Sequence, residues 1–67
     1  MMTNKELVAM LYSKYGKMQL TKAETAHEIG VSIATLDNMR RDGLITGKKV
    51  SHQIFFTLTT IVNHLSE

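Results

Sequence analysis

Residues 20–43 read LTKAETAHEIGVSIATLDNMRRDG, and this stretch decides the fold. Thr21, followed three residues later by Glu24, has the spacing of a capping box, in which each side chain bonds a free backbone N–H at a helix start. A helix is therefore expected to begin at Lys22. Gly30 is expected to end it, because glycine readily adopts the left-handed conformation found at helix C-termini.

The second half of this stretch predicts another short helix. Ser32 is a favoured N-cap residue, so the helix is expected over residues 33–42, with Gly43 as its stop. Leu36 and Met39 would face inward. The inward face of the preceding helix is predicted to consist of Ala23, Ala26 and Ile29. Two helices joined by a three-residue turn have the spacing of a helix-turn-helix.

The segment before residue 20 predicts one more helix. Thr3 and Glu6 repeat the capping-box spacing, so a helix is expected over residues 4–15, ending at Gly16. Its predicted apolar face is Leu7, Met10 and Leu11, widened by Val8, Tyr12 and Tyr15. This face is expected to pack on the helix pair, with self-association as the alternative. Residues 17–20 are expected to form an extended linker with Met18 and Leu20 on one side.

The pattern changes after Gly43. Residues 44–56 lack a helical period and contain a turn candidate at residues 51–52, which predicts a β-hairpin pairing residues 47–50 with 53–56. Alternation turns Phe55 outward, where either Tyr12 or Tyr15 of the first helix covers it or a second copy contacts it. A C-terminal helix is expected over residues 57–67, with Thr57 or Thr59 as N-cap, because apolar residues recur at helical spacing at Leu58, Ile61, Val62 and Leu65.

Composition restricts the class of protein. The 67 residues suffice for one small domain, residues 1–67, and the fold class is expected to be mainly α with a small β-hairpin. The absence of cysteine excludes disulfides and thiolate metal sites. No apolar run approaches the ~20 residues of a membrane span, and the N-terminal MMTNKELV lacks a signal-peptide pattern, so a cytoplasmic location without membrane contact is expected. The net charge of +2 is only mildly basic.

The chain from residue 20 onward resembles the MerR-type winged helix domain of phage excisionases and small AlpA-like regulators, which belong to mobile genetic elements. The residues that carry the resemblance are Leu20, Thr21, Ala26, Gly30, Val31, Ser32, Thr35, Leu36, Gly43, Ile54, Phe56 and Leu65. It implies a winged helix-turn-helix, with an extra N-terminal helix (1–16), a helix-turn-helix (20–43), a wing (44–56) and a C-terminal helix (57–67).

The chain departs from the family pattern at two places. The family often has a basic residue where Asn38 stands, and a Gly-Arg-Arg-like wing tip where this chain has residues 51–53, Ser-His-Gln. Lys48 and Lys49, on the strand before the tip, are expected to supply the missing charge.

The second helix of the pair is expected to read the major groove of double-stranded DNA. With its apolar residues turned inward, Ala34, Asn38 and Arg41 lie on the opposite face. Arg41 suits a bidentate contact to guanine, Asn38 suits adenine, and Ala34 allows close approach to a thymine methyl. Asp37, four residues before Arg41, is expected either to pair with it or to accept a bond from a cytosine amino group.

The remaining DNA contacts are expected around this helix. Its exposed start and the start of the preceding helix are suited to the groove or to phosphate oxygens, and the wing to the backbone. These contacts are assigned to Ser32, Ile33, Thr21, Lys22, Lys48, Lys49 and His52.

No enzyme, metal site or cofactor is expected. His27, His52 and His64 lie in separate elements without ligand-like spacing, and no nucleophile constellation or phosphate-binding glycine loop is present. The favoured function is a sequence-specific DNA-binding transcriptional regulator, acting as a homodimer or as side-by-side copies. The alternatives are a recombination directionality factor that assists an integrase, and a protein-interaction module that no longer binds DNA.

Overall fold

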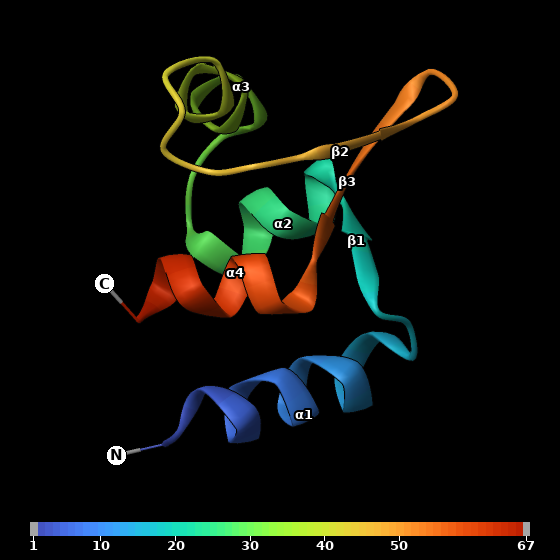
Figure 1. The fold of residues 1–67 in the computed structure, drawn as a ribbon, viewed down its shortest axis with the longest axis vertical. Helices are drawn as coiled ribbons and strands as arrows, with labels where there is room; N and C mark the ends of the chain where they lie inside the picture. Colours follow the sequence, from blue (N-terminus) through green and yellow to red (C-terminus); the bar gives the residue numbers. More distant parts are fainter. Residues whose placement is uncertain (1, 67) are drawn as a thin grey trace.

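The computed structural model describes residues 2–66, and within them it contains four helices and a three-stranded antiparallel sheet (Figure 1). The elements follow one another as α1 (Asn4–Tyr15), β1 (Gln19–Thr21), α2 (Lys22–Ile29), α3 (Ile33–Arg41), β2 (Lys48–Val50), β3 (Gln53–Thr57) and α4 (Leu58–Leu65). The mainly helical fold class is thereby confirmed, and each of the four expected helices is present; α3 and α4 end at Arg41 and Leu65 rather than at residues 42 and 67, and residue 67 lies outside the described residues.

The helix termini lie where the local sequence signals place them. The capping boxes at Thr3 and Thr21 are both complete, and each threonine Oγ1 accepts a hydrogen bond of 3.2 Å from the backbone N–H three residues later. Gly16 and Gly30 end α1 and α2 with φ of 70° and 78°. Thr57, rather than Thr59, is the N-cap of α4. Because capping is a local interaction, sequence alone suffices to place these ends.

The sheet has one more strand than the sequence predicted. Residues 17–20 were expected to be a linker, but β1 pairs with β3, so that Leu20 lies opposite Phe56 and the strand order is β1-β3-β2. Both of these side chains are fully buried. Met18, expected on the same side as Leu20, is instead 58% exposed. Pairing with β3 gives the short segment its backbone partners and places Leu20 in the core.

The predicted hairpin is confirmed, with Val50 opposite Gln53 and Lys48 opposite Phe55. Its two-residue turn holds Ser51 at a φ of 59°, the left-handed region that tight hairpin turns require. Phe55 is half-buried between Lys48 on β2 and Thr21 on β1. Lys48 and Thr21 are therefore its cross-strand neighbours in the sheet.

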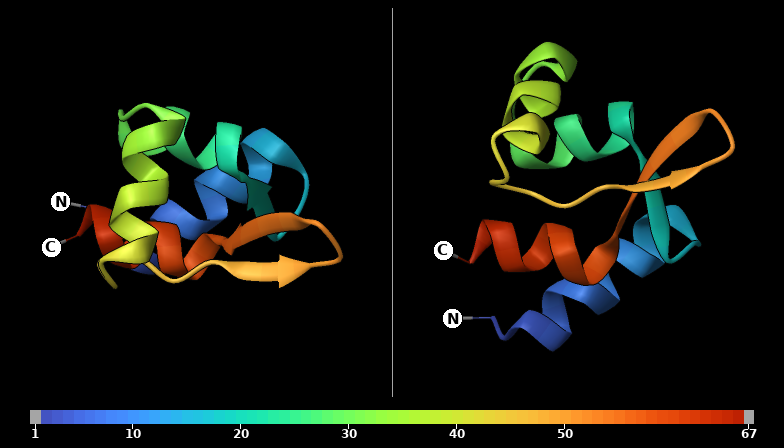
Figure 2. Two further views of the ribbon diagram at one scale, coloured as in Figure 1. Left: turned by 90° about the horizontal axis from the view of Figure 1, so that it is seen from above. Right: turned by 45° about the horizontal axis from the view of Figure 1, so that its top comes forward.

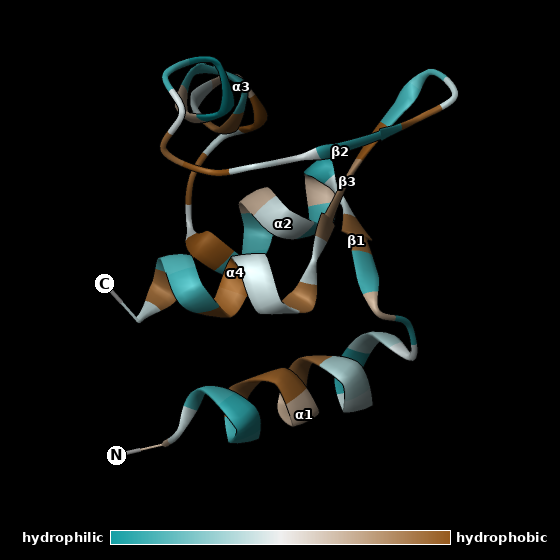
Figure 3. Cartoon of the chain, in the orientation of Figure 1, coloured by the Kyte–Doolittle hydropathy of each residue, from teal (hydrophilic) through white to brown (hydrophobic). Residues whose placement is uncertain are grey.

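The core lies between the inner face of the sheet and the helices. Its buried apolar residues are Leu11, Leu20, Ala26, Leu36, Ile45, Phe56, Leu58, Ile61 and Val62. Helix α1 packs chiefly against α4, at the side of the molecule away from α3, and not on the helix pair as expected (Figure 1). The brown apolar segments of α1 and α4 in Figure 3 follow this contact.

Several predicted inward faces are shifted. In α2, Ala23 is exposed and Thr25 is fully buried in its place, next to Ala26. In α1, Met10 and Tyr12 are 55% and 44% exposed. The residues of α1 that pack inward are Leu7, Val8, Leu11 and Tyr15. The apolar stripe of α1 is thus narrower than its sequence suggested, because α4 covers only one side of it.

The C-terminal helix shows the same effect at its end. Leu65, predicted to continue the apolar face of α4, is 44% exposed, whereas Leu58, Ile61 and Val62 are fully buried. No helix within residues 2–66 is long and apolar enough to cross a membrane.

Candidate functional site

The helix pair α2–α3 and the tip of the hairpin stand on one side of the molecule. Figure 1 shows α3 and the β2–β3 turn reaching the same side, with the start of α2 between them and α1 on the opposite side. Seen from above in Figure 2, α3 and the hairpin lie in front of the other elements. The elements predicted to contact DNA therefore share one face.

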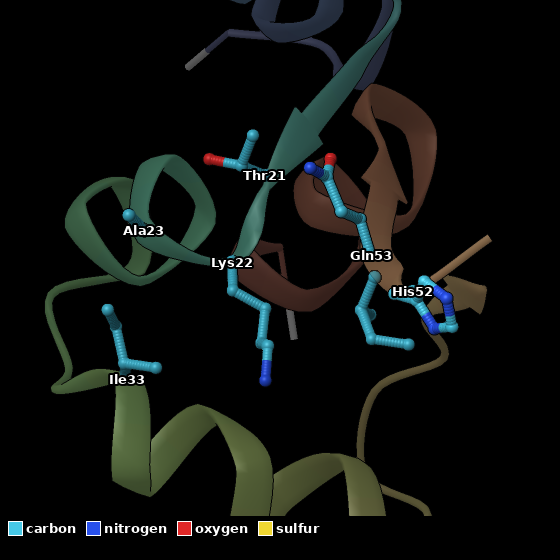
Figure 4. Close-up of a pocket in the computed structure, with 7 residues that line it drawn as sticks. Thr21, Lys22, Ala23, Ile33, His52 and Gln53 are labelled. Carbon is cyan, nitrogen blue, oxygen red and sulfur yellow. The ribbon is translucent and has the colours of Figure 1, made fainter. Parts of the chain in front are cut away.

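A groove of about 410 Å³ lies between these elements (Figure 4). It joins the start of α2, the start of α3 and the hairpin, and it is lined by Thr21, Lys22, Ala23, Ile33, His52, Gln53 and Ile54. Four residues predicted separately from the sequence, Thr21, Lys22, Ile33 and His52, are thus brought together. Ala23, Gln53 and Ile54 were not predicted, because only the folded hairpin places the last two opposite α2.

Helix α3 presents its predicted reading face to solvent. Ser32 caps its start, with the Oγ accepting a 3.1 Å hydrogen bond from the backbone N–H of Thr35. Leu36 is fully buried, whereas Ala34, Asn38 and Arg41 are exposed. The burial of one side of α3 leaves the opposite side free for a partner.

Asp37 pairs differently from the prediction. Its Oδ1 accepts a 2.9 Å hydrogen bond from Lys22 Nζ of α2 and lies 3.5 Å from Arg40 Nη1, one turn further along α3. The expected partner, Arg41, instead has its Nε 3.5 Å from Asp42. The sequence did not predict this pair, because Lys22 and Asp37 are fifteen residues apart and only the crossing of α2 and α3 brings them together.

Arg40 is also a residue that the sequence did not single out. A Cβ built on Gly47 would lie 2.8 Å from Arg40 Cδ and 2.7 Å from Ile54 Cγ2. The aliphatic part of the arginine therefore crosses the backbone at the base of the hairpin, where no side chain larger than hydrogen fits without a shift. Arg40 connects α3 to the hairpin, and Asp37 connects Arg40 to α2.

The two lysines of β2 point to opposite faces of the sheet, because successive side chains alternate along a strand. Lys49 lies opposite Ile54, a residue of the groove lining, whereas Lys48 lies opposite Phe55 on the other face. Both lysines are exposed. The structure thus places two residues that the sequence treated as equivalent on opposite faces of the sheet, and both faces carry groove-lining residues, Ile54 on that of Lys49 and Thr21 and Gln53 on that of Lys48.

Charge is distributed unevenly over the molecule. Lys22, helix α3 with its C-cap, and strand β2 carry five cations and two carboxylates, a net of three positive charges against +2 for the whole chain, whereas Glu24 in the first turn of α2 is paired with Lys17. The cations are Lys22, Arg40, Arg41, Lys48 and Lys49, and the carboxylates are Asp37 and Asp42. The rest of the chain is therefore slightly acidic, and the face that carries α3 and the hairpin is basic.

Carboxylates on the other side of α2 are used for internal contacts with α1. Glu28, 14% exposed, lies 2.7 Å from Lys14 Nζ and accepts a hydrogen bond from the Tyr15 hydroxyl. These donors lower the pKa of Glu28, and the same carboxylate raises the pKa of Tyr15 to about 12. Glu24 lies 2.8 Å from Lys17 Nζ, and this ion pair together with the Thr21 cap lowers the pKa of Glu24.

The structure offers no arrangement for metal chemistry in the part of the chain that it describes: residues 2–66 contain no cluster of three or more histidine, aspartate or glutamate side chains.

Comparison of the chain with protein-family models, with curated proteins and with solved structures gave no match.

Proposed function

We propose that this chain binds double-stranded DNA as a winged helix-turn-helix, with α3 in the major groove and the β2–β3 hairpin as a wing beside it, and that it acts as a small transcriptional regulator of the excisionase or AlpA type. The observation that carries the proposal is the convergence of α3, the start of α2 and the hairpin tip around one groove, on the face that holds the excess positive charge.

The dimensions of α3 suit this role. An α-helix with its side chains is about 10–12 Å across, which fits the major groove of B-DNA, about 12 Å wide, and the nine residues of α3 give a length of about 13 Å. Arg41 would read guanine through its guanidinium, and Asn38 would pair with adenine. Ala34, one turn before Asn38, leaves room for a thymine methyl. Base recognition is thus assigned to the exposed side of α3.

The groove beside α3 suits the sugar–phosphate backbone. Lys22 extends into it from the first turn of α2, where free backbone N–H groups favour a phosphate oxygen (Figure 4). His52 and Gln53 line the same groove from the hairpin. These contacts would set the position of α3 on the duplex without reading its sequence.

A single domain of this size buries too little surface for specific binding of high affinity, so the functional unit is expected to be two or more copies on adjacent half-sites. The proposal therefore includes either a homodimer or copies placed side by side on DNA.

The test is a salt series of duplex binding followed by selection from a random DNA pool. Fluorescence anisotropy with a labelled mixed-sequence duplex should show binding at low salt, with log affinity falling linearly against log salt, because phosphate contacts release counterions. Selection should then enrich a common sequence. Phosphate contacts dominate binding at low salt, and roughly 50 mM is the lower end of that range. If the chain does not bind a duplex there, the proposal is overturned and a protein-interaction module is favoured.

The genomic position of the enriched sequence distinguishes the two DNA-binding roles. A site beside a promoter supports the regulator. A site beside an integrase attachment sequence overturns that part of the proposal and makes the chain a recombination directionality factor. Both outcomes preserve α3 as the reading element.

A further inference from the structure

Asp37 is one of two acidic residues on a face that carries five cations. A carboxylate here repels DNA phosphates and weakens binding to any duplex. Its ion pairs bring little stability, because the side chains of Lys22, Arg40 and Asp37 are 35%, 35% and 41% exposed. Neither affinity nor stability accounts for the position of this residue.

Asp37 connects three elements of the face. Through Lys22 it reaches the start of α2, at 2.9 Å, and through Arg40 it reaches the base of the hairpin, where the arginine stem crosses Gly47. One carboxylate oxygen thus lies within ion-pair distance of two cations, Lys22 of α2 and Arg40 of α3 itself. Without the Asp37 carboxylate, the side chains of Lys22 and Arg40 are free to pair with any nearby phosphate.

We propose that Asp37 is a positioning residue that raises sequence selectivity by restraining Lys22 and Arg40, at the expense of affinity for unrelated DNA. The inference rests on the proposed DNA-binding function. Non-specific complexes are weakened because the single negative charge of Asp37 already attracts two cations within the protein. Specific complexes retain the register that the fixed side chains impose on α3.

The test compares Asp37→Asn with wild type on two duplexes, the sequence enriched by selection and its shuffled counterpart. Affinity for the shuffled duplex should rise, and the ratio of selected to shuffled affinity should fall by at least about threefold. The slope of log affinity against log salt should steepen by up to about 1.8, since each newly made phosphate contact adds about 0.9. An unchanged melting temperature shows that the fold is retained.

Asp42→Asn is the matched control, because it removes the same charge from the other acidic residue of this face. Asp42 and Arg41 are 59% and 72% exposed, so their pair restrains little. Asp42→Asn should raise affinity for both duplexes alike and leave their ratio unchanged. Asp37→Glu, which keeps the carboxylate, should restore most of the selectivity.

A double-mutant cycle shows whether Asp37 acts through Lys22. Lys22→Ala should change the affinity ratio in wild type, but much less in the Asp37→Asn background, because the restraint is already absent. Equal effects of Asp37→Asn and Asp42→Asn on the ratio, or additive effects in the cycle, would overturn this inference and leave DNA binding itself intact. Failure of wild type to bind any duplex would instead overturn the proposed function.

Discussion

The carboxylates of α2 pair one to one with lysines of α1 and of the segment that follows it, whereas α3 and β2 hold more cations than carboxylates. On the α1 side, Lys14 and Lys17 are neutralised by Glu28 and Glu24. On the other side, Asp37 and Asp42 face five cations. Ion pairs between lysines and carboxylates therefore hold the elements together on one side of α2, whereas on the other side the excess of cations leaves a basic surface. Changes on the two sides should separate stability from binding.

The largest effect is expected at the junction between the two sides, where α3 meets the hairpin. Gly47→Ala places a methyl group 2.7 Å from Ile54 Cγ2 and 3.2 Å from Phe56 Cε2, so core side chains must shift in addition to Arg40. The expected loss is about 1–3 kcal/mol of unfolding free energy, measured by urea denaturation. Thr46→Ala, at the exposed neighbouring position, is the control and should change stability little.

Arg41→Ala should remove the largest share of DNA selectivity without affecting stability, because this side chain is 72% exposed. Loss of a bidentate guanine contact corresponds to about 1–3 kcal/mol of discrimination between bases, roughly ten- to hundredfold in the affinity ratio. Binding to the selected duplex and to single-base variants measures it. Lys14→Ala removes a cation from the α1 side and should leave DNA binding unchanged. An equal loss in the two variants would contradict the assignment of α3 as reader.

The ends of the elements were predictable from sequence because their causes are local. Ser32, Gly30 and the capping boxes act within four residues of the positions they define. Strand β1 was not predictable in the same way, since its three residues are a strand only through pairing with β3, more than thirty residues later. Local patterns fix where helices begin and end, and long-range pairing decides which extended segments become strands.

The residues of the candidate site also fall into those that local patterns predict and those that depend on long-range packing. The exposed side of α3 follows from the helical period once Leu36 is placed inward, so Ala34, Asn38 and Arg41 were predictable. The roles of Arg40 and Gly47 depend on how closely α3 approaches the hairpin. No sequence period carries that information, although a glycine between two predicted elements is a signal of close approach.

Lowering the pH should first weaken the contacts that Glu28 of α2 makes with α1. The pKa of Glu28 is held below its ordinary value of 4.5 in the folded chain, so its stabilising effect is complete above that pH and is lost as the pH falls further. Glu28→Gln should cost about 1 kcal/mol at neutral pH and flatten the acid limb of the stability curve. Thermal unfolding from pH 7 to pH 3 measures both, and an unchanged acid limb would show that Glu28 contributes nothing to cohesion.

The smallest predicted effect is a difference in the salt dependence of DNA binding between variants of the two lysines of β2. It tests whether DNA contacts the basic side at defined positions. Lys49 shares with Ile54 the face of the sheet that lies toward Arg40 of α3, whereas Lys48 shares the opposite face with Phe55. Lys49→Ala should lower affinity by a similar factor on every sequence and reduce the salt slope by about 0.9, the value of one phosphate contact. Lys48→Ala should reduce the slope by less, although it removes the same charge. Equal slopes for the two variants would mean that DNA responds to net charge alone, and that the groove between α2, α3 and the hairpin does not hold the backbone.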